Sequence, residues 1–164
     1  MIRQIDEQLT LVYTSQFPMF FMKNSSKKRS VTIGVGGNIG DVVKRFEKLI
    51  NILRKDKRVD LIATSAILKN PPFGILEQKY FYNSIIIIKT DMFPKEILAY
   101  LLHLEKKFGR IRELKNGPRT LDLDIIFIDD MIIKTDALHV PHPHWNQRDS
   151  VLIPLQIINK VINL

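Results

Sequence analysis

Two aspartates, Asp122 and Asp124, stand one residue apart in an otherwise apolar run, "GPRTLDLDIIF" (117–127). The alternation over 121–128 has a period of two and predicts a β-strand. Residues i and i+2 share one face of a strand, so the carboxylates should lie about 7 Å apart or closer. At an effective dielectric of about 20, their repulsion costs roughly 2 kcal/mol. A divalent cation would offset that cost, and Mg²⁺ commonly binds together with a phosphate substrate, so the pair predicts a magnesium site.

The loop just before this strand, "GRIRELKNGPRT" (109–120), is rich in cations. It contains a single acid, Glu113, and four basic residues: Arg110, Arg112, Lys115 and Arg119. A solvated run of charge is the ordinary explanation for such a loop. Its direct attachment to the aspartate pair favours another, because phosphoryl transfer needs metal ions across phosphate oxygens and cations on the developing charge.

Three further stretches contain polar groups suited to ligand binding. In "HVPHPHW" (139–145) the prolines exclude a helix and the histidine spacing matches no zinc site, so one histidine directed at a phosphate is the preferred interpretation. In "FYNS" (81–84) Phe81 and Asn83 share a strand face and could stack on a flat ring and read its edge. A core Phe81 and a turn-capping Asn83 explain that stretch equally well. "GVGGNIGD" (34–41) lacks the spacing of a dinucleotide or Walker loop and favours a tight strand-to-helix turn.

Composition bounds the class of protein. The chain has 164 residues, 45% of them hydrophobic and 26% charged, which favours one globular domain. There is no cysteine, which excludes thiol catalysis and thiolate metal sites and fits a cytoplasmic location. The net charge of +8 indicates an anionic partner. No apolar run approaches the ~18 residues of a membrane span, so we expect no membrane partner.

The order of elements predicts the fold. Strands are expected at 31–36, 59–68, 81–90 and 121–128, with helices at 39–55, capped by Asn38, and from Pro94 to a stop at Gly109. This βαββαβ order predicts an α+β, ferredoxin-like sandwich: a mostly antiparallel sheet with its helices on one face. A C-terminal extension should add a hairpin and a short final helix. Residues 1–30, which end in a polar, basic stretch, are expected to be an N-terminal arm or extension outside a single catalytic domain at 31–164.

Together these stretches resemble the 6-hydroxymethyl-7,8-dihydropterin pyrophosphokinase family of folate synthesis. The resemblance covers about residues 31–155. Its most specific motif is "GPRTLDLDIIF", supported in the family's order by "GGNIGD", "NPPFG", "FYNS", "EKKFGRIR" and "VPHPHWNQRDSVLIPL". The resemblance implies transfer of pyrophosphate from ATP to the pterin's hydroxymethyl group, with release of AMP, by a monomer that binds two Mg²⁺ ions and no nucleic acid.

The resemblance also implies roles for individual residues. Asp122 and Asp124 match the metal-binding carboxylates, and with Arg110 and Arg119 they form the implied catalytic set. The positions that match the ATP site are Glu105, Arg110, Arg112, Arg119, Ile125, His142 and Arg148. The positions that match the pterin site are Asn70, Pro71, Pro72, Phe73, Phe81 and Asn83.

Two departures from the family concern the pterin site. Ser150 stands where the family has a phenylalanine that sandwiches the pterin ring, and Asn116 stands where a loop aromatic is common. Two other classes of protein remain open. An RNA-recognition module shares the strand order and basic charge, but the expected first strand lacks the exposed aromatics that such modules use to stack bases. A phosphotransferase of another type is the third interpretation.

Overall fold

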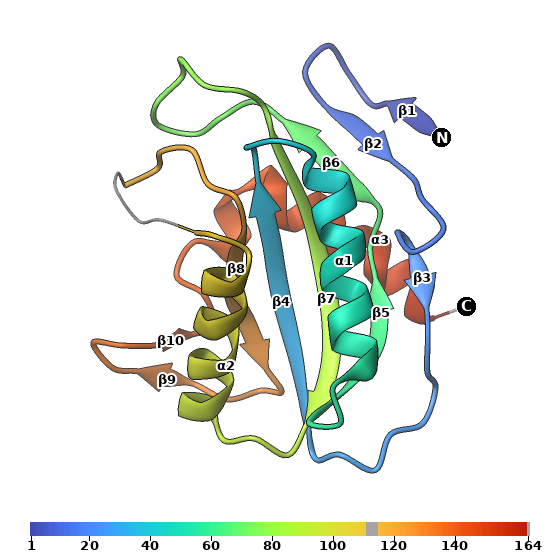
Figure 1. The fold of residues 1–164 in the computed structure, drawn as a ribbon, viewed down its shortest axis with the longest axis vertical. Coiled ribbons are helices and arrows are strands. Elements are labelled where there is room, and N and C mark those ends of the chain that lie inside the picture. Colours follow the sequence, from blue (N-terminus) through green and yellow to red (C-terminus); the bar gives the residue numbers. More distant parts are fainter. Residues whose placement is uncertain (111–114, 164) are drawn as a thin grey trace.

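The computed structural model describes residues 1–110 and 115–163 (Figure 1). Its strands are β1 (Ile2–Gln4), β2 (Thr10–Val12), β3 (Met19–Phe20), β4 (Arg29–Gly37), β5 (Val59–Thr64), β6 (Ile67–Asn70), β7 (Phe81–Thr90), β8 (Asp122–Ile128), β9 (Ile133–Lys134) and β10 (His139–Val140). Its helices are α1 (Val42–Lys55), α2 (Pro94–Lys107), the short 3₁₀ helix η1 (Trp145–Gln147) and α3 (Asp149–Ile162).

The central sheet confirms the predicted fold class. β8, β4 and β7 lie side by side in that order, and the free edge of β7 pairs with both β5 and β6. Every one of these pairings is antiparallel. Because α1 follows β4 and α2 follows β7, the chain follows the βαββαβ path of a ferredoxin-like fold. The strand expected at 59–68 is divided into β5 and β6, since Ser65 and Ala66 interrupt the regular strand.

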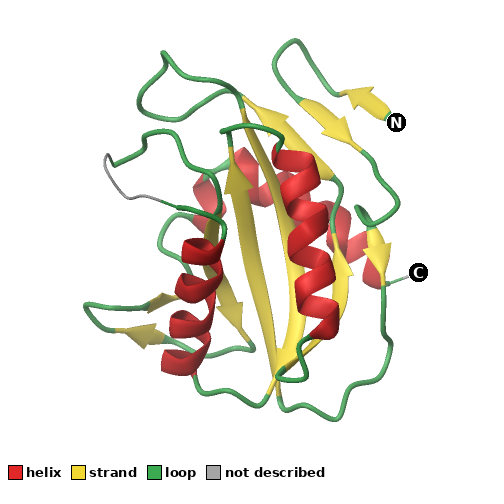
Figure 2. Cartoon of the chain, viewed as in Figure 1, coloured by secondary structure: helices red, strands yellow, loops and turns green. Residues whose placement is uncertain are grey.

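Helices α1 and α2 cover one face of the sheet, as predicted (Figure 2). Helix α1 forms because its apolar residues recur three or four apart and make one stripe, which is buried: Val42, Phe46, Leu49, Ile50 and Leu53. The predicted cap at Asn38 is wrong. Asp41 is the N-cap, and its side chain accepts a hydrogen bond from the Lys44 backbone N–H at 3.0 Å. Helix α2 begins with Pro94 and ends before Gly109, whose φ of +77° suits a glycine stop.

The final helix differs from the prediction in length and position. The extension does begin with a hairpin, β9–β10, but α3 spans 14 residues and lies on the face of the sheet opposite α1 and α2 (Figure 1). Its Leu155 and Ile158 pack with Ile85 and Ile126, which point from β7 and β8 to that face. No helix among residues 1–110 and 115–163 is both long and apolar enough to cross a membrane.

The N-terminal segment, expected to be an arm or extension, is joined to the edge of the sheet. β2 pairs with β6 and β3 pairs with β5. Phe17, between them, is 0% exposed, and its ring centroid lies 6.0 Å from that of Phe46 in α1. An apolar side chain buried this completely stabilises the core. The segment therefore extends the sheet and contributes to the core beneath α1.

Candidate active site

A cleft opens on the α3 face of the sheet, above a floor made of glycine. Gly34 and Gly36 point to this face of β4, between β7 on one side and β8 on the other. Without side chains at these two positions the backbone itself forms the floor. The cleft is lined by Gly34, Val35, Gly36, Asn70, Phe73, Phe81, Asn83, Ser84, Asn116, Arg119, Asp122, Asp124, Ile126, His142, Arg148, Ser150 and Val151.

Strand register places the two halves of the predicted site in one row. Gly36 pairs with Asn83 of β7 on one side and with Asp122 of β8 on the other. Neighbouring strands lie about 4.8 Å apart, so the two backbones are separated by about 10 Å across the glycine. One row therefore holds the predicted pterin-binding amide and a predicted metal-binding carboxylate at opposite sides of the same floor.

The β7 side of the cleft combines amides with aromatic rings. Asn83 Nδ2 donates to Asn70 Oδ1 at 2.7 Å, and Asn70 Nδ2 donates to the Pro71 carbonyl at 3.0 Å. These bonds fix the direction in which the Asn83 amide faces. Phe81 lies two residues before it on the same strand and lines the same cleft. The Phe81 ring can therefore stack on a flat ligand, and the Asn83 amide can form hydrogen bonds with the ligand's edge.

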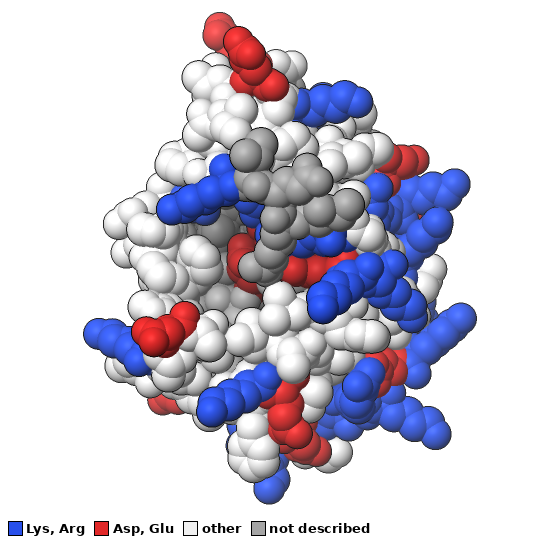
Figure 3. Space-filling model, turned by 60° about the vertical axis from the view of Figure 1, so that its left-hand side comes forward, with Lys and Arg blue, Asp and Glu red and all other residues white. Residues whose placement is uncertain are grey.

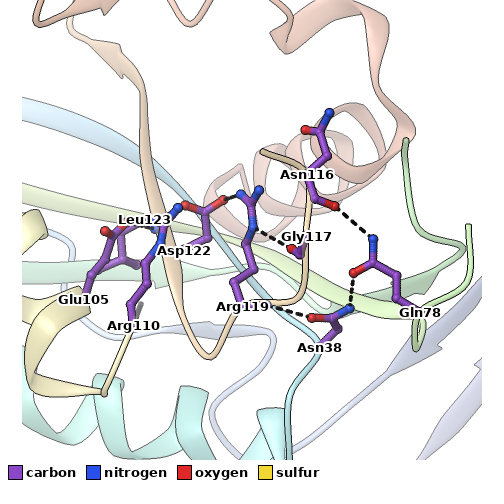
Figure 4. Close-up of polar contacts among 9 residues, drawn as sticks. All are labelled: Asn38, Gln78, Glu105, Arg110, Asn116, Gly117, Arg119, Asp122 and Leu123. Carbon is purple, nitrogen blue, oxygen red and sulfur yellow. Dashed lines mark hydrogen bonds and ion pairs between the residues drawn. The ribbon is translucent and has the colours of Figure 1, made fainter. Parts of the chain in front are cut away.

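The β8 side is a cluster of paired charges around Asp122 (Figure 4). Arg110 Nη1 lies 2.5 Å from Asp122 Oδ1, and Arg119 Nη1 lies 2.5 Å from Asp122 Oδ2. Arg110 Nη1 also lies 2.5 Å from Oε1 of Glu105, a nearly buried residue of α2. Glu105 Oε1 in turn accepts the Leu123 N–H at 2.8 Å. The side chains of Arg110 and Asp122 are only 11% and 15% exposed, which keeps their charges poorly screened.

These arginines change the explanation of the aspartate pair. The sequence suggested that a bound cation offsets the repulsion between the carboxylates, whereas Arg110 and Arg119 already offset part of it. Asp124 is exposed to the cleft, yet its pKa is raised to about 7, first by desolvation of its carboxyl among the surrounding protein atoms and then by the negative charges of Asp122 and Glu105. The two arginines oppose that rise in pKa. An added positive charge at this point of the cleft would favour the ionised carboxylate.

The donor set fits Mg²⁺ that is bound together with a phosphate substrate. Asp122 and Asp124 present carboxylate oxygens on one face of β8, and both line the cleft. Across the described part of the chain, no group of three acidic, histidine or cysteine side chains forms a complete protein metal site. Mg²⁺ is usually held by one or two carboxylates, with phosphate and water completing its octahedron. Two aspartates are therefore enough if a triphosphate provides the rest.

The wall opposite the floor comes from the C-terminal extension. His142 is half-buried, and burial and the positive charge of Arg148 lower the pKa of its imidazole. The His142 Nδ1 accepts the His144 backbone N–H at 3.2 Å. The Arg148 guanidinium lies 5.0 Å from the ring centroid of Phe73, which is 67% exposed on the loop after β6. Ser150 lines the same wall at the start of α3.

Not every predicted residue lines the cleft. Glu105 and Arg110 stand behind Asp122 in the charge cluster. The Ile125 side chain is buried with the core beneath α1 and α2, on the other face of the sheet. Pro71 and Pro72 form the backbone of the loop beside Asn70, and Arg112 lies outside the described residues. The remaining predicted residues meet in the cleft: Asn70, Phe73, Phe81, Asn83, Arg119, Asp122, Asp124, His142 and Arg148.

Sequence reasoning missed two kinds of residue. The alternation of Gly34 and Gly36 on one face of a strand signals a surface stripped of side chains, but only the adjoining turn was predicted. Asn38 and Gln78 were not predicted as site residues. Both form hydrogen bonds with the loop that leads to Arg119 (Figure 4). No local pattern distinguishes these two amides from ordinary loop residues.

Comparison with known proteins agrees with this geometry. Residues 32–160 match the family model described as 7,8-dihydro-6-hydroxymethylpterin-pyrophosphokinase. Relatives named 2-amino-4-hydroxy-6-hydroxymethyldihydropteridine pyrophosphokinase are 37% identical over 149 residues in Helicobacter pylori (89% of this chain, 91% of the relative) and 39% identical over 142 residues in Campylobacter jejuni (87% and 90%). A Bacillus subtilis relative of the same name is 37% identical over 123 residues (75% and 74%). The chain therefore belongs to the 7,8-dihydro-6-hydroxymethylpterin pyrophosphokinase family.

Proposed function

We propose that this protein transfers the terminal pyrophosphoryl group of ATP to the hydroxymethyl group of 6-hydroxymethyl-7,8-dihydropterin, in folate biosynthesis. The observation that carries the proposal is the row Asn83–Gly36–Asp122 in one cleft. An amide that can read a heterocycle and a carboxylate that can hold a phosphate-bound cation lie about 10 Å apart, across a floor without side chains. That arrangement suits the joining of a flat ring to a triphosphate.

The reaction divides naturally between the two sides of the cleft. The hydroxymethyl oxygen attacks the β-phosphorus of ATP, and the bond from that phosphorus to the oxygen bridging to the α-phosphate breaks. AMP leaves with the bridging oxygen and its electron pair, and the hydroxyl loses its proton. Asn83 and Phe81 orient the ring so that its substituent points along the row toward Asp122. Such positioning accounts for much of the catalysis in phosphoryl transfer.

The charged side of the cleft is suited to the triphosphate. Asp122 and Asp124 are the residues that would hold Mg²⁺, and the chemistry that Mg²⁺ supplies when bound is neutralisation of phosphate charge and a lower pKa for the attacking hydroxyl. Arg119, which lines the cleft, stabilises the negative charge that develops on the bridging oxygen, and Arg110 adds positive charge from behind Asp122. We propose that His142 and Arg148, which line the same cleft from the facing wall, bind the nucleotide.

The basic surface has a role consistent with this proposal. Lysine and arginine side chains are spread over the face seen in Figure 3, and acidic atoms are visible in a hollow between them. A net charge of +8 attracts an anionic nucleotide to the cleft. We propose a monomer whose substrates are ATP and the pterin, without nucleic acid. We propose a cytoplasmic location, where both substrates are available.

One experiment tests the reaction. The protein is mixed with ATP, MgCl₂ and 6-hydroxymethyl-7,8-dihydropterin, and the nucleotide products are separated by chromatography. AMP should form in equal amount with the pyrophosphorylated pterin, and both should disappear when the pterin is omitted or when EDTA removes the metal. ADP in place of AMP would show simple phosphoryl transfer and overturn the proposal. RNA binding at micromolar concentration that ATP–Mg²⁺ does not displace would favour the RNA-recognition alternative.

A further inference from the structure

Asn38 forms hydrogen bonds with both backbone groups of Arg119, its N–H and its carbonyl (Figure 4). Asn38 directly follows the last residue of β4, and its exposed fraction is 4%. Its backbone N–H donates to the Arg119 carbonyl at 3.0 Å, and its Oδ1 accepts the Arg119 N–H at 3.0 Å. Two bonds to the same residue fix both the position and the direction of the chain at Arg119. The loop that delivers this arginine is thereby anchored to the end of the sheet.

The other end of the Asn38 amide faces the pterin-side loop, residues 71–80. Its Nδ2 donates to Gln78 Oε1 and to the Lys79 carbonyl, both at 3.0 Å. The oxygen of this amide thus meets a donor and its nitrogen meets two acceptors, which uses all of its donors. A buried amide whose donors are all satisfied is held in one orientation, and losing either partner would leave a polar group unpaired.

Gln78 completes the connection between the two loops. Its Nε2 donates to the Asn116 carbonyl at 2.9 Å and to the Ile75 carbonyl at 2.7 Å. The side chain is partly buried, whereas the residues at 73–77, 79 and 80 are exposed. The two loops also approach each other closely at Gly74 and Asn116. There is little room for a side chain at Gly74, because an added Cβ would lie only 3.1 Å from Cβ of Asn116.

At the far end of this network lies the guanidinium of Arg119. Its Nε donates to the Gly117 carbonyl at 3.3 Å, and its Nη1 pairs with Asp122. A continuous set of hydrogen bonds therefore runs from the loop of 71–80, through Gln78 and Asn38, to the arginine that pairs with Asp122. The two connecting side chains are uncharged, so their bonds depend on geometry more than on ionic strength.

We propose that Asn38 and Gln78 are positioning residues that hold the Arg119 guanidinium in register with the pterin-side loop. The inference rests on the proposed function and deepens it. The two amides hold the Arg119 backbone, and with it the guanidinium beside Asp122, in the position that the transfer step needs. Loss of either amide link should let the arginine move away from that position.

Gln78→Glu is the sharpest test. A glutamate keeps the Oε1 acceptor for Asn38 but removes the donors to Asn116 and Ile75, so it breaks the link to the arginine loop and one bond within the 71–80 loop while keeping the link to Asn38. Glu77→Gln, an exposed neighbour on the same loop, is the matched control. We expect kcat to fall 10- to 100-fold in Gln78→Glu, with the KM for ATP changed less than threefold, because misplacement by about 1 Å is that costly to the transfer step. The control should keep wild-type kcat.

Hydrogen exchange provides a second readout that does not require activity. In Gln78→Glu the Arg119 amide should exchange at least tenfold faster than in the wild type, although Gln78 itself makes no bond to Arg119 among the described contacts. Asn38→Ala should give at least the same loss of protection. Wild-type exchange at Arg119 together with wild-type kcat in Gln78→Glu would overturn the inference. If the wild type releases no AMP, the proposed function fails, while the exchange data still decide whether the loops are linked.

Discussion

Asn83 and Asp122 face one cleft from opposite sides of Gly36, because both residues pair with that glycine in the sheet. The relationship depends on the absence of a side chain between them. A Cβ on Gly36 would lie 2.6 Å from Asn83 Oδ1, closer than real Cβ contacts come. The spacing of the strands therefore sets the distance between the two halves of the site. The glycine leaves the space between them free of side chains.

The first prediction concerns that glycine. Gly36→Ala should displace the Asn83 amide and weaken pterin binding at least tenfold, the equivalent of one lost hydrogen bond. Titration of pterin fluorescence measures it. Gly34→Ala adds the same methyl group one row away, 3.3 Å from the flexible end of Ile126, and should cost less pterin affinity. Equal affinities in the wild type and Gly36→Ala would show that Asn83 does not contact the ring.

The two aspartates should respond differently to neutralisation. Asp122→Asn removes the partner of two poorly exposed arginines and should lower the free energy of unfolding by about 1–3 kcal/mol. Asp124→Asn removes a charge that its surroundings disfavour, so stability should stay level or rise. Both variants should lose AMP formation more than 100-fold. Urea unfolding at pH 8 and an AMP assay measure the two effects.

The control for that pair is Asp130→Asn, an exposed turn residue after β8. It should match the wild type in stability and in AMP formation. Wild-type activity in either Asp122→Asn or Asp124→Asn would refute the assignment of the metal-binding carboxylates. Greater stability in Asp122→Asn would show that the arginine pairs cost more in desolvation than they return.

The third prediction follows from the raised pKa of Asp124. Its folded value is about 7 and the ordinary value is 3.8, so between these pH values the folded protein binds more protons than the unfolded chain. The free energy of unfolding should therefore fall as pH rises from about 4 to about 7. The carboxyl is open to the cleft, and solvent screening limits the fall to about 1 kcal/mol. Urea denaturation without metal gives the free energy of unfolding of the wild type and of Asp124→Asn at each pH. The difference between the two isolates the contribution of Asp124.

A flat difference curve from pH 4 to 7 would contradict the raised pKa. A complementary check is to titrate the folded protein with Mg²⁺ and a non-hydrolysable ATP analogue at several pH values and to measure the binding affinity. Binding of the cation requires the ionised carboxylate, so wild-type affinity for the metal–nucleotide pair should increase as pH rises toward 7. Asp124→Asn should lack that pH dependence.

Phe17 tests whether the N-terminal segment belongs to the core. Its side chain is 0% exposed and packs on Phe46, so Phe17→Ala should lower the free energy of unfolding by about 3–5 kcal/mol. Phe20→Ala, at a residue that is 40% exposed on β3, should cost well under half as much. Chemical denaturation measures both. A change below 1 kcal/mol in Phe17→Ala would mean that the segment contributes little to the folded domain.

Ser150 tests how the second face of the pterin is covered. Phe81 can stack on one face of the ring, but the serine on the opposite wall cannot stack on the other. Ser150→Phe should leave ATP affinity unchanged and keep or improve pterin affinity by up to several-fold, since a well-placed aromatic contact is worth about 0.5–1.5 kcal/mol. Isothermal titration with each ligand measures this. A large loss of pterin affinity would show that Phe73 or Arg148 already occupies the space.

Local patterns in the sequence determined the elements and the direction of their side chains. The period of two over 121–128 placed Asp122 and Asp124 on one strand face, and α1 buries the stripe that its spacing predicted. Such patterns are reliable because i+2 and i+3 or i+4 neighbours are related by backbone geometry alone. The resemblance of short motifs then pointed to most of the residues that line the cleft.

Tertiary structure decided the rest, because it depends on contacts between distant parts of the chain. Asn38 looked like a helix cap in sequence, yet its partner Arg119 lies 81 residues away. The contacts of the arginines with Asp122 and of Phe17 with α1 likewise cannot be predicted from short stretches of sequence. The placement of α3 on the face opposite α1 and α2 depends on which face of β7 and β8 still had apolar side chains to bury. The sequence thus determined which groups could take part in the chemistry, and the fold determined which of them are held together.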